Sequence, residues 1–475
     1  MFDVIFINPL DKKEEGKEFF SLFSRLKKIR LLPPLGLAYL ASFLREAGFK
    51  VKIIDANALR LNQEDLRRII ASDKPKIVAV TSTTPVFNSS LNVCKLVKDI
   101  DTKIITVMGG VHITVMPFET LQFHSCIDYG IIRDGEIPLL ELTKRLIKKA
   151  DVSGIPGLVY RDANVNVRLN PNDTLIDDLD KIPFPAWDML PVERYFDVTC
   201  KSYHTVSLVS SRGCPFKCAF CERDVRGGHL RKRSAGNFVD EIELLLKNYG
   251  FKELLFYDDT FTVDKKRVIE ICAEIKKRKL SFHWDCRTRS DMISPEIAKL
   301  MKEAGCRRIS LGIESADQKV LNALNKGITP QQAALAVKAV KDAGMEVLAY
   351  FMLGSPGESQ ETLKRTFKFS LELEPDFAYY SITVGYPGTD LLDAALKSGA
   401  TPLRYWPEYV KNAGILPGPL PYFQDNGLNR SFIDSFQKRA YMGFYLSPKF
   451  ILNSLKKIRS LRDLFWYGRM ARACF

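Results

Sequence analysis

The hydrophobic pattern of the first 150 residues alternates between short β-branched runs and amphipathic segments. The runs predict strands at residues 3–9, 51–56, 76–83, 103–110 and 128–133, and the segments between them predict helices at 37–47, 63–71, 91–99 and 138–149. Strands that alternate with helices form parallel sheets that are covered on both faces. We therefore predict a doubly wound, flavodoxin-like α/β domain over residues 1–150, whose ligands bind beyond the carboxyl ends of the strands.

The pattern breaks over residues 151–200. Five prolines interrupt it, at positions 156, 171, 183, 185 and 191. Residues 158–169 alternate around a turn at 162–164 and predict a hairpin. We interpret this stretch as a linker that contains a small hairpin.

From about residue 203 the alternation of strands and helices resumes. It predicts strands at 205–210, 253–258, 282–287, 308–314, 347–353 and 378–384, and helices at 238–248, 265–278, 295–303, 331–342, 360–372 and 389–397. Six consecutive βα units predict a partial (β/α)6 barrel over residues 201–402, with its active site at the carboxyl ends of the strands. Beyond it, residues 403–475 predict a helical tail.

This tail is basic. From Lys438 onward it holds nine Lys and Arg residues against one Asp, which gives 9 − 1 = +8 of the chain's total of +14. Apolar residues form one helical face, at Ile451, Leu455, Ile458, Leu461 and Phe465. We expect this face to pack against the barrel; peripheral contact with an anionic membrane is the alternative. Nucleic acid is not an expected partner.

Composition narrows the class of protein. The chain has 475 residues, of which 46% are hydrophobic and 11% aromatic. This composition excludes an intrinsically disordered chain. The sequence lacks an apolar run long enough to cross a membrane, and its start, Met1-Phe2-Asp3, does not resemble a secretory signal, so we expect a cytoplasmic protein. Ten cysteines are too few for a disulfide framework and predict free thiols or metal ligands.

Three of these cysteines lie close together, at Cys214, Cys218 and Cys221. Three thiolates in one loop after a strand are able to ligate three irons of a [4Fe–4S] cluster and leave the fourth iron open. A structural zinc site, the alternative, needs a fourth ligand. The nearest histidine is His229, and its spacing is not that of a zinc finger. The spacing therefore favours the cluster.

This C-x3-C-x2-C loop, with the aromatic Phe220 before the third cysteine, resembles that of the radical S-adenosylmethionine (SAM) superfamily. The resemblance implies that SAM chelates the open iron and that one electron cleaves it to methionine and a 5′-deoxyadenosyl radical. It also implies SAM contacts at strand ends. Phe220 is one; Asp258 or Asp259 is placed for the amino group, Arg287 for the carboxylate, Glu314 for the ribose and Gly354 for adenine.

The first domain resembles the cobalamin-binding domain of the B12-dependent radical SAM class. The match lies in PPLGLAYLA at 33–41, VTSTT at 80–84, GGVHIT at 109–114 and RDGE at 133–136. The implied cobalamin contacts are Pro34, Leu35, Ser82, Thr83, Gly109, Gly110, Val111, His112 and Glu136. A D-x-H-x-x-G signature is missing, so cobalt bound here would lack that axial histidine. A flavodoxin-like domain without a corrin is the alternative.

The class includes the anaerobic Mg-protoporphyrin monomethyl ester oxidative cyclase and radical SAM C-methylases. The resemblance thus implies methylation or cyclisation of an unactivated carbon in a hydrophobic small-molecule or lipid substrate, with a flavodoxin- or ferredoxin-type electron donor. A tRNA methylthiotransferase is a second hypothesis, but its family uses three further N-terminal cysteines, and only Cys94 and Cys126 precede residue 200. A third is a non-enzymatic metal- or nucleic-acid-binding module, which predicts zinc and no SAM cleavage.

Overall fold

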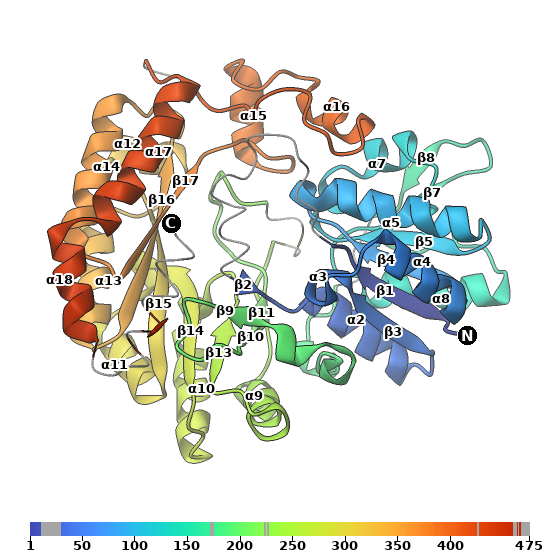
Figure 1. Cartoon of the computed structure of the whole chain (residues 1–475), viewed down its shortest axis with the longest axis horizontal. Helices are drawn as coiled ribbons and strands as arrows, with labels where there is room; N and C mark the ends of the chain where they lie inside the picture. The colour runs from blue at the N-terminus through green and yellow to red at the C-terminus, as the bar shows by residue number, and fades with distance from the viewer. Residues whose placement is uncertain are drawn as a thin grey trace.

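The computed structural model describes residues 1–10, 30–171, 175–222, 225, 228–424, 427–458, 463, 465 and 466. Two α/β domains lie side by side, each built around its own sheet (Figure 1). The predicted fold class is confirmed: a doubly wound domain is followed by a partial barrel and C-terminal helices. No helix in the described part of the chain is long and apolar enough to cross a membrane.

The first sheet has the strand order β3-β1-β4-β5-β6-β7-β8. Its strands are β1 (Val4–Asn8), β3 (Val51–Asp55), β4 (Ile77–Thr81), β5 (Ile105–Gly109), β6 (Tyr129–Ile131), β7 (Leu158–Arg161) and β8 (Val167–Leu169). The first five are parallel, in the flavodoxin-like order. The predicted hairpin is present as β7 and β8, and it extends this sheet because β7 pairs antiparallel with β6.

Helices cover both faces of the first sheet, because its strands are apolar on both sides. Alternate residues of β1 show this: Val4 and Phe6 pack in one core cluster, while Ile5 and Ile7 pack in the other. The helices are α2 (Leu35–Glu46) and α8 (Glu136–Lys148) on one face, and α4 (Gln63–Asp73) and α5 (Phe87–Ile100) on the other.

The second sheet is entirely parallel, and its order β10-β13-β14-β15-β16-β17 follows the chain. Its strands are β10 (Val206–Leu208), β13 (Glu253–Phe256), β14 (His283–Arg289), β15 (Cys306–Glu314), β16 (Glu346–Leu353) and β17 (Phe377–Ile382). Six helices follow these strands: α9 (Ala235–Tyr249), α10 (Lys265–Lys277), α11 (Pro295–Glu303), α13 (Pro330–Asp342), α14 (Gln360–Leu373) and α15 (Asp390–Lys397). Each matches a helix that the hydrophobic pattern predicts.

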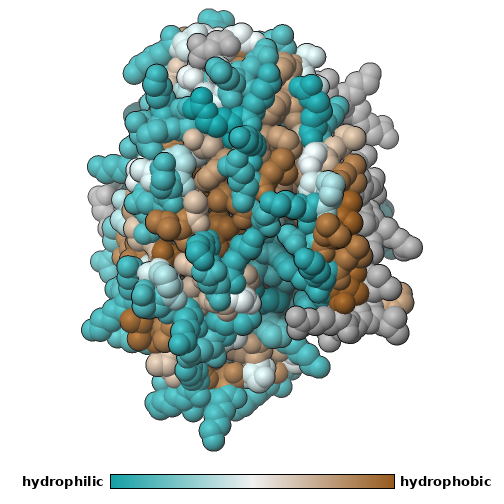
Figure 2. Space-filling model, turned by 90° about the vertical axis from the view of Figure 1, so that its left-hand side faces the viewer, coloured by the Kyte–Doolittle hydropathy of each residue, from teal (hydrophilic) through white to brown (hydrophobic). Residues whose placement is uncertain are grey.

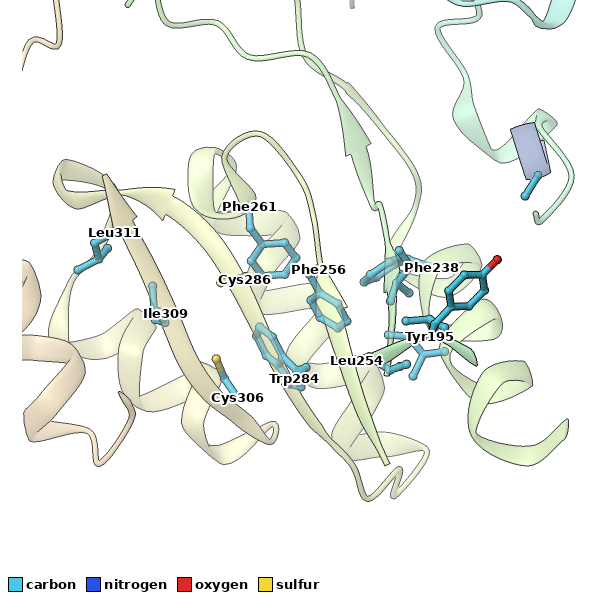
Figure 3. Close-up of a cluster of buried hydrophobic side chains, with 14 of the residues drawn as sticks. Tyr195, Phe238, Leu254, Phe256, Phe261, Trp284, Cys286, Cys306, Ile309 and Leu311 are labelled. Carbon is cyan, nitrogen blue, oxygen red and sulfur yellow. The ribbon is translucent and has the colours of Figure 1, made fainter. Parts of the chain in front are cut away.

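The two faces of the second sheet differ sharply. Side chains that point toward the helices are buried and aromatic: Trp284 stacks on Phe256 with ring centroids 4.6 Å apart, and its indole N–H donates to the Ala304 carbonyl at 2.8 Å (Figure 3). Along β16 buried and half-buried residues alternate strictly, and the half-buried ones lie on the inner face. The inner face is therefore the one available to a ligand.

Ion pairs join the two domains beside the cysteine loop. Arg212, in β11 (Ser211–Arg212), donates to Asp134 at 3.1 Å and to Glu136 at 2.7 Å. Arg231 donates to the same oxygen of Asp134 at 2.6 Å. Burial raises the pKa of Asp134, but the two guanidinium groups outweigh it and hold that pKa below its usual value. Because Asp134 and Glu136 follow β6, the carboxyl edge of the first sheet meets the cysteine loop of the second domain.

Two further contacts close this junction. Gly388, in the loop after β17, has a φ of +81°, and a Cβ there would lie 2.6 Å from Glu222 and 2.7 Å from Val115. Val115 ends α6 (Val111–Val115) of the first domain. The helix α16 (Tyr405–Lys411) packs near α7 (Pro117–Phe123), and the Tyr409 hydroxyl donates to the Thr84 carbonyl. Part of the C-terminal region thus belongs to the core of the first domain.

The remaining helices, α17 (Arg430–Tyr445) and α18 (Pro448–Lys457), lie on the barrel. The prediction that the apolar stripe packs inward is wrong for Ile451, Leu455 and Phe465, which are 44%, 58% and 77% exposed. Instead Phe450 packs against Phe444 and Tyr445 of α17, while Lys457 pairs with Asp376 and Lys449 pairs with Glu374. Leu461 of the stripe and the arginines at 459, 462, 469 and 472 lie outside the described residues.

Candidate functional site

The cysteine loop lies over the carboxyl ends of the barrel strands. Cys214 Sγ is 3.5 Å from the hydroxyl of Thr260, which follows β13. Arg289, the last residue of β14, donates to Cys218 Sγ at 3.3 Å. Cys218 is buried and Cys221 is exposed. The loop is therefore fixed to two neighbouring strand ends, as the position of an active site in a barrel requires.

Cationic groups surround these thiols. Burial raises the pKa of the Cys218 thiol, while Lys326 and Arg289 act to lower it. Lys326 Nζ lies 2.8 Å from Glu314 and 5.5 Å from the centre of the Phe220 ring, and both members of this ion pair are buried. Positive charge favours the thiolate, which is the form that binds metal.

The donor set fits an iron–sulfur cluster. Among the described residues, no three His, Cys, Asp or Glu side chains converge on a point that would hold a single metal ion. A cluster needs no such convergence, since each thiolate ligates its own iron. His229, the nearest histidine, instead contacts Asp177 at 3.1 Å. Three thiols in one loop at the strand ends therefore suit the cluster.

The two aspartates predicted for the SAM amino group have different surroundings. Asp258 is buried and accepts hydrogen bonds from the Ser210 hydroxyl at 2.9 Å and from the Ser211 hydroxyl. It thereby anchors the start of the cysteine loop. Asp259 is exposed beside Thr260, which contacts Cys214. Of the two carboxylates, Asp259 is the one that faces outward next to the loop.

Glu314 lies against the backbone of its own strand. A Cβ at Gly312 would lie 2.6 Å from the Glu314 carboxylate and 2.7 Å from Lys326 Nζ, so a side chain there would displace this ion pair. Glu314 itself adopts a φ of +68°, which is a rare conformation for a residue with a side chain. The strand end is thus shaped around the Glu314–Lys326 pair.

Arg287 and Gly354 lie apart from that pair. Register places Arg287 opposite Ser310, whereas Arg289 lies opposite Gly312, so Arg287 is two residues deeper in the barrel. Its guanidinium stacks on the Tyr257 ring at 3.7 Å. Gly354 has a φ of +72°, and its N–H donates to buried Glu358 at 2.7 Å. Burial raises the pKa of Glu358 to about 7.

Sequence reasoning missed three residues that contact the cysteine loop: Thr260, Arg289 and Lys326. Thr260 and Arg289 follow or end strands that the pattern does predict, so their positions at strand ends are the signal that would have found them. Lys326 carries no such signal, because it lies in the loop after α12 (Gln318–Ala323) and reaches the site only through folding.

In the first domain, the predicted glycines lie where two loops approach each other closely. A Cβ at Gly110, whose φ is +101°, would lie 2.6 Å from the Ser82 carbonyl, and the N–H of His112 donates to that same carbonyl at 3.1 Å. Ser82 N–H in turn donates to the Gly109 carbonyl at 2.9 Å. The loops after β4 and β5 are therefore bonded to each other at the carboxyl edge of the sheet.

His112 is fully buried. Its Nδ1 lies 3.3 Å from the Thr84 hydroxyl, its Nε2 lies 3.4 Å from the Thr120 hydroxyl, and its ring lies 4.0 Å from that of Phe87. Burial, with a smaller contribution from His124, lowers the pKa of His112 to about 3. Both ring nitrogens are thus engaged by the protein.

The other predicted cobalamin residues divide by exposure. Glu136 is buried and bonded to Arg212, as described above. Thr83 and Val111 are exposed at the carboxyl edge, while Pro34 and Leu35 are half-buried where α2 begins. The exposed members supply hydroxyl and apolar surface that suits a bulky cofactor, and in the described chain none of the predicted positions offers cobalt a histidine from the surface.

Family models match both domains. The model of the Radical SAM superfamily matches residues 208–370, and that of the B12 binding domain matches residues 30–143. An uncharacterized methyltransferase of Pyrococcus horikoshii is 37% identical over 424 residues, which cover 89% of this chain and 90% of that protein. The anaerobic magnesium-protoporphyrin IX monomethyl ester cyclase of Rubrivivax gelatinosus is 32% identical over 76% of this chain and 65% of its own length.

Solved structures share the fold. The radical SAM methyltransferase TsrM of Kitasatospora setae, solved with cobalamin and a [4Fe–4S] cluster bound, has a TM-score of 0.77 at 18% identity and covers 100% of this chain and 99% of its own. The cobalamin-dependent SAM radical enzyme OxsB, solved with aqua-cobalamin and SAM, has a TM-score of 0.70 at 18% identity over 100% of this chain and 71% of its own. Both solved structures therefore share the two-domain fold of this chain.

We expect buried, neutral His112 to make the fold sensitive to acid. Because the pKa of His112 falls to about 3 in the fold, the unfolded chain binds the proton first, and stability decreases as the pH falls below the unfolded value of about 6.5. This protonation lowers the free energy of unfolding by about 2 kcal/mol at pH 5 relative to neutral pH. Urea unfolding at pH 7 and pH 5 measures it.

In His112→Asn, the decrease in the free energy of unfolding between pH 7 and pH 5 should be smaller by about that amount. The matched control, His204→Asn, changes an exposed histidine and should keep the wild-type drop. An unchanged drop in His112→Asn would contradict the assignment of a neutral, buried ring.

Proposed function

The chain belongs to the family of radical SAM enzymes with a B12-binding domain, and on this premise we propose that it transfers a methyl group to an unactivated carbon of a small molecule. The cofactors of this family are a [4Fe–4S] cluster, SAM and cobalamin. When bound, the cluster supplies the electron that splits SAM, and cobalamin supplies a carrier for the methyl group. Methyl transfer is favoured over cyclisation because the methyltransferase relative matches 90% of its length and the cyclase 65%.

The observation that carries this proposal is the position of the cysteine loop. Cys214, Cys218 and Cys221 hold the cluster at the strand ends, where Arg289 donates to a cysteine sulfur. The buried Lys326 and Arg289 stabilise the negative charge of the thiolates and exclude water from one side of the site. This arrangement favours a cluster over the zinc-module hypothesis. The methylthiotransferase hypothesis is disfavoured on a different ground, because only Cys94 and Cys126 precede residue 200.

For SAM, we assign the contact with the amino group to Asp259, because Asp258 is engaged by the serines of the loop. Glu314 is held near the cluster by Lys326 and accepts from the ribose hydroxyls. Phe220 covers one side of the nucleoside, and the loop at Gly354 receives the adenine.

For cobalamin, we assign contacts to the loops at the carboxyl edge of the first sheet. The exposed Thr83 and Val111 and the half-buried Pro34 and Leu35 would contact the corrin, and Ser82, Gly109 and Gly110 would shape the loops that hold it. His112 supports this surface from inside the core, and Glu136 fixes it to the barrel through Arg212. We also propose that a flavodoxin or ferredoxin delivers the electron.

The cysteine assignment has a direct test. Cys214→Ala, Cys218→Ala and Cys221→Ala should each lose the brown chromophore and the cleavage of SAM under strong reductant, since each removes one of three iron ligands. Iron analysis, visible spectroscopy and chromatography of the SAM products measure the loss. Cys126→Ala, which changes a half-buried thiol of the first domain, should leave both intact; SAM cleavage that survives any of the three changes would refute the assignment.

Methyl transfer is tested by the fate of the methyl group. The loaded enzyme is incubated anaerobically with methyl-labelled SAM and a small-molecule extract of the source cells. We expect the label to appear in a new extract component, because a methylase retains this group in its product. The Cys218→Ala enzyme should produce no labelled component. Label recovered only in methionine, together with an extract component that has lost hydrogen, would indicate cyclisation instead.

We further propose that α18 contacts the cytoplasmic face of an anionic membrane. Its outward face carries Ile451, Leu452 and Leu455, which are 44–58% exposed and recur at helical spacing. The exposed Lys456 flanks this face, and Figure 2 views the molecule from this side and shows apolar residues grouped on it. An apolar face flanked by lysine suits the boundary between acyl chains and anionic headgroups.

Vesicle binding tests this contact. The full-length enzyme should sediment with vesicles of equal parts phosphatidylglycerol and phosphatidylcholine, and much less with phosphatidylcholine alone. Leu452→Glu combined with Leu455→Glu should reduce the bound fraction about fivefold or more, because two leucines that insert into the bilayer surface are lost and two anions are added. Leu335→Glu, at an exposed leucine of α13, is the matched control. Wild-type protein that stays in the supernatant would refute the membrane contact.

A further inference from the structure

We propose that Arg30 and Arg287, on the inner face of the barrel, bind an oxyanion of the substrate, a carboxylate or phosphate carried by an aromatic or planar molecule. The inference rests on the proposed function and names the substrate class of the same site. Its basis is a pair of guanidinium groups that share one tyrosine and make no ion pair with the protein.

The two arginines come from distant parts of the chain. Arg30 lies in β2 (Arg30–Leu31), which pairs with β9 (Phe196–Asp197), while Arg287 lies in the middle of β14. Arg30 Nη1 donates to the Tyr257 hydroxyl at 3.1 Å, and the Arg287 guanidinium stacks on the ring of the same tyrosine at 3.7 Å. Tyr257 therefore holds both cations at one place.

Their hydrogen-bonding capacity is largely unused. A guanidinium offers five N–H donors. Within the described residues, Arg30 makes a single hydrogen bond, Arg287 makes none, and neither lies within salt-bridge distance of a carboxylate. Arg287 is also partly buried, and a cation withdrawn from water requires an anion or hydrogen-bond acceptors.

The nearest carboxylates, Asp197 and Asp285, attract the two arginines electrostatically but form no ion pair with them within the described residues. Asp285 accepts from Arg308 at 3.0 Å. Asp197 accepts from the hydroxyl and the N–H of Thr199 at 2.6 and 2.8 Å. Asp285 and one oxygen of Asp197 thus have hydrogen-bond donors of their own. The charge of Arg30 and Arg287 remains available to a ligand, and the planar fork of arginine matches carboxylate and phosphate oxygens.

Tyrosine rings lie close to the two guanidinium groups and indicate what kind of ligand body fits there. Tyr350 and Tyr379, on β16 and β17, lie 5.7 Å apart between ring centroids and close enough to Arg30 to interact with it electrostatically. Both are half-buried. Three tyrosine rings around two guanidinium groups favour an aromatic or planar body with an acidic substituent.

The depth of the pair favours the substrate over SAM as the source of the oxyanion. Arg289 contacts the cysteine loop, and Arg287 lies two residues farther from it along β14, which is about 6.6 Å along a strand. The layer next to the cysteines already contains Lys326 and Arg289. The amino-acid part of SAM, which chelates the cluster, therefore has cations nearer than Arg287.

Phenyl phosphate serves as the probe, with benzyl alcohol as its neutral counterpart. Calorimetry is performed on the full chain loaded with cluster and cobalamin, and SAM binding is titrated in parallel. Wild-type enzyme should bind phenyl phosphate and not benzyl alcohol. Arg30→Gln and Arg287→Gln should each weaken phenyl phosphate binding about tenfold while SAM affinity changes less than about twofold, because each removes one charge-assisted contact.

Two controls keep this test decisive. Arg68→Gln, at an exposed arginine of α4, should bind phenyl phosphate as the wild type does. Arg287→Lys keeps the charge and protects the fold, yet should weaken binding about threefold, because lysine lacks the planar fork.

Three outcomes would overturn the inference. They are wild-type enzyme that does not bind phenyl phosphate, Gln variants that bind it undiminished, and a loss of SAM affinity in Arg287→Gln equal to the loss for phenyl phosphate. The last outcome would assign Arg287 to the SAM carboxylate. Failure of the proposed function would appear separately, as wild-type enzyme that does not cleave SAM.

Discussion

The arrangement of this protein depends on one buried contact, the bonding of Arg212 to Asp134 and Glu136. Arg212 stands two residues before the first cysteine of the loop, and its partners follow the last parallel strand of the first sheet. Because all three side chains are at most 13% exposed, removing Arg212 would leave Glu136 without its charged partner, a change that costs about 3–5 kcal/mol. The contact thus fixes the carboxyl edges of the two sheets against each other.

The chemistry of the site follows from that orientation. The cysteine loop, the loops after β4 and β5, and the turn at Gly388 all meet where the two sheets end. Positive charge is layered beneath them: Lys326 and Arg289 lie next to the thiols, and Arg287 lies deeper. The first layer stabilises thiolates, and the second is free for an acidic ligand. A single barrel face can therefore separate cofactor from substrate by depth along its strands.

Several residues of the sequence motifs support the site through buried contacts. Asp258 holds the serines that precede the loop, His112 packs between two threonines, and Glu136 receives Arg212. Burial explains the pattern, since a polar group inside a protein must be hydrogen-bonded, and these groups find protein partners. The tail differs, because Lys449 and Lys457 are exposed where they pair with Glu374 and Asp376. There Phe450 packs against Phe444 and Tyr445, and the apolar stripe of α18 faces outward.

Local sequence determined the elements and the cysteine loop. Strands such as β1 and β14 and helices such as α11 begin and end within a few residues of their predicted bounds, because hydrophobic periodicity and chain connectivity alone favour parallel α/β units. The spacing of the cysteines likewise required no other part of the chain. Tertiary structure alone decided which charges meet. Lys326 reaches Glu314, Arg30 reaches Tyr257 and α16 joins the first domain through contacts between distant segments, and no local pattern records them, since an ion pair depends on position in space and leaves no period in the sequence.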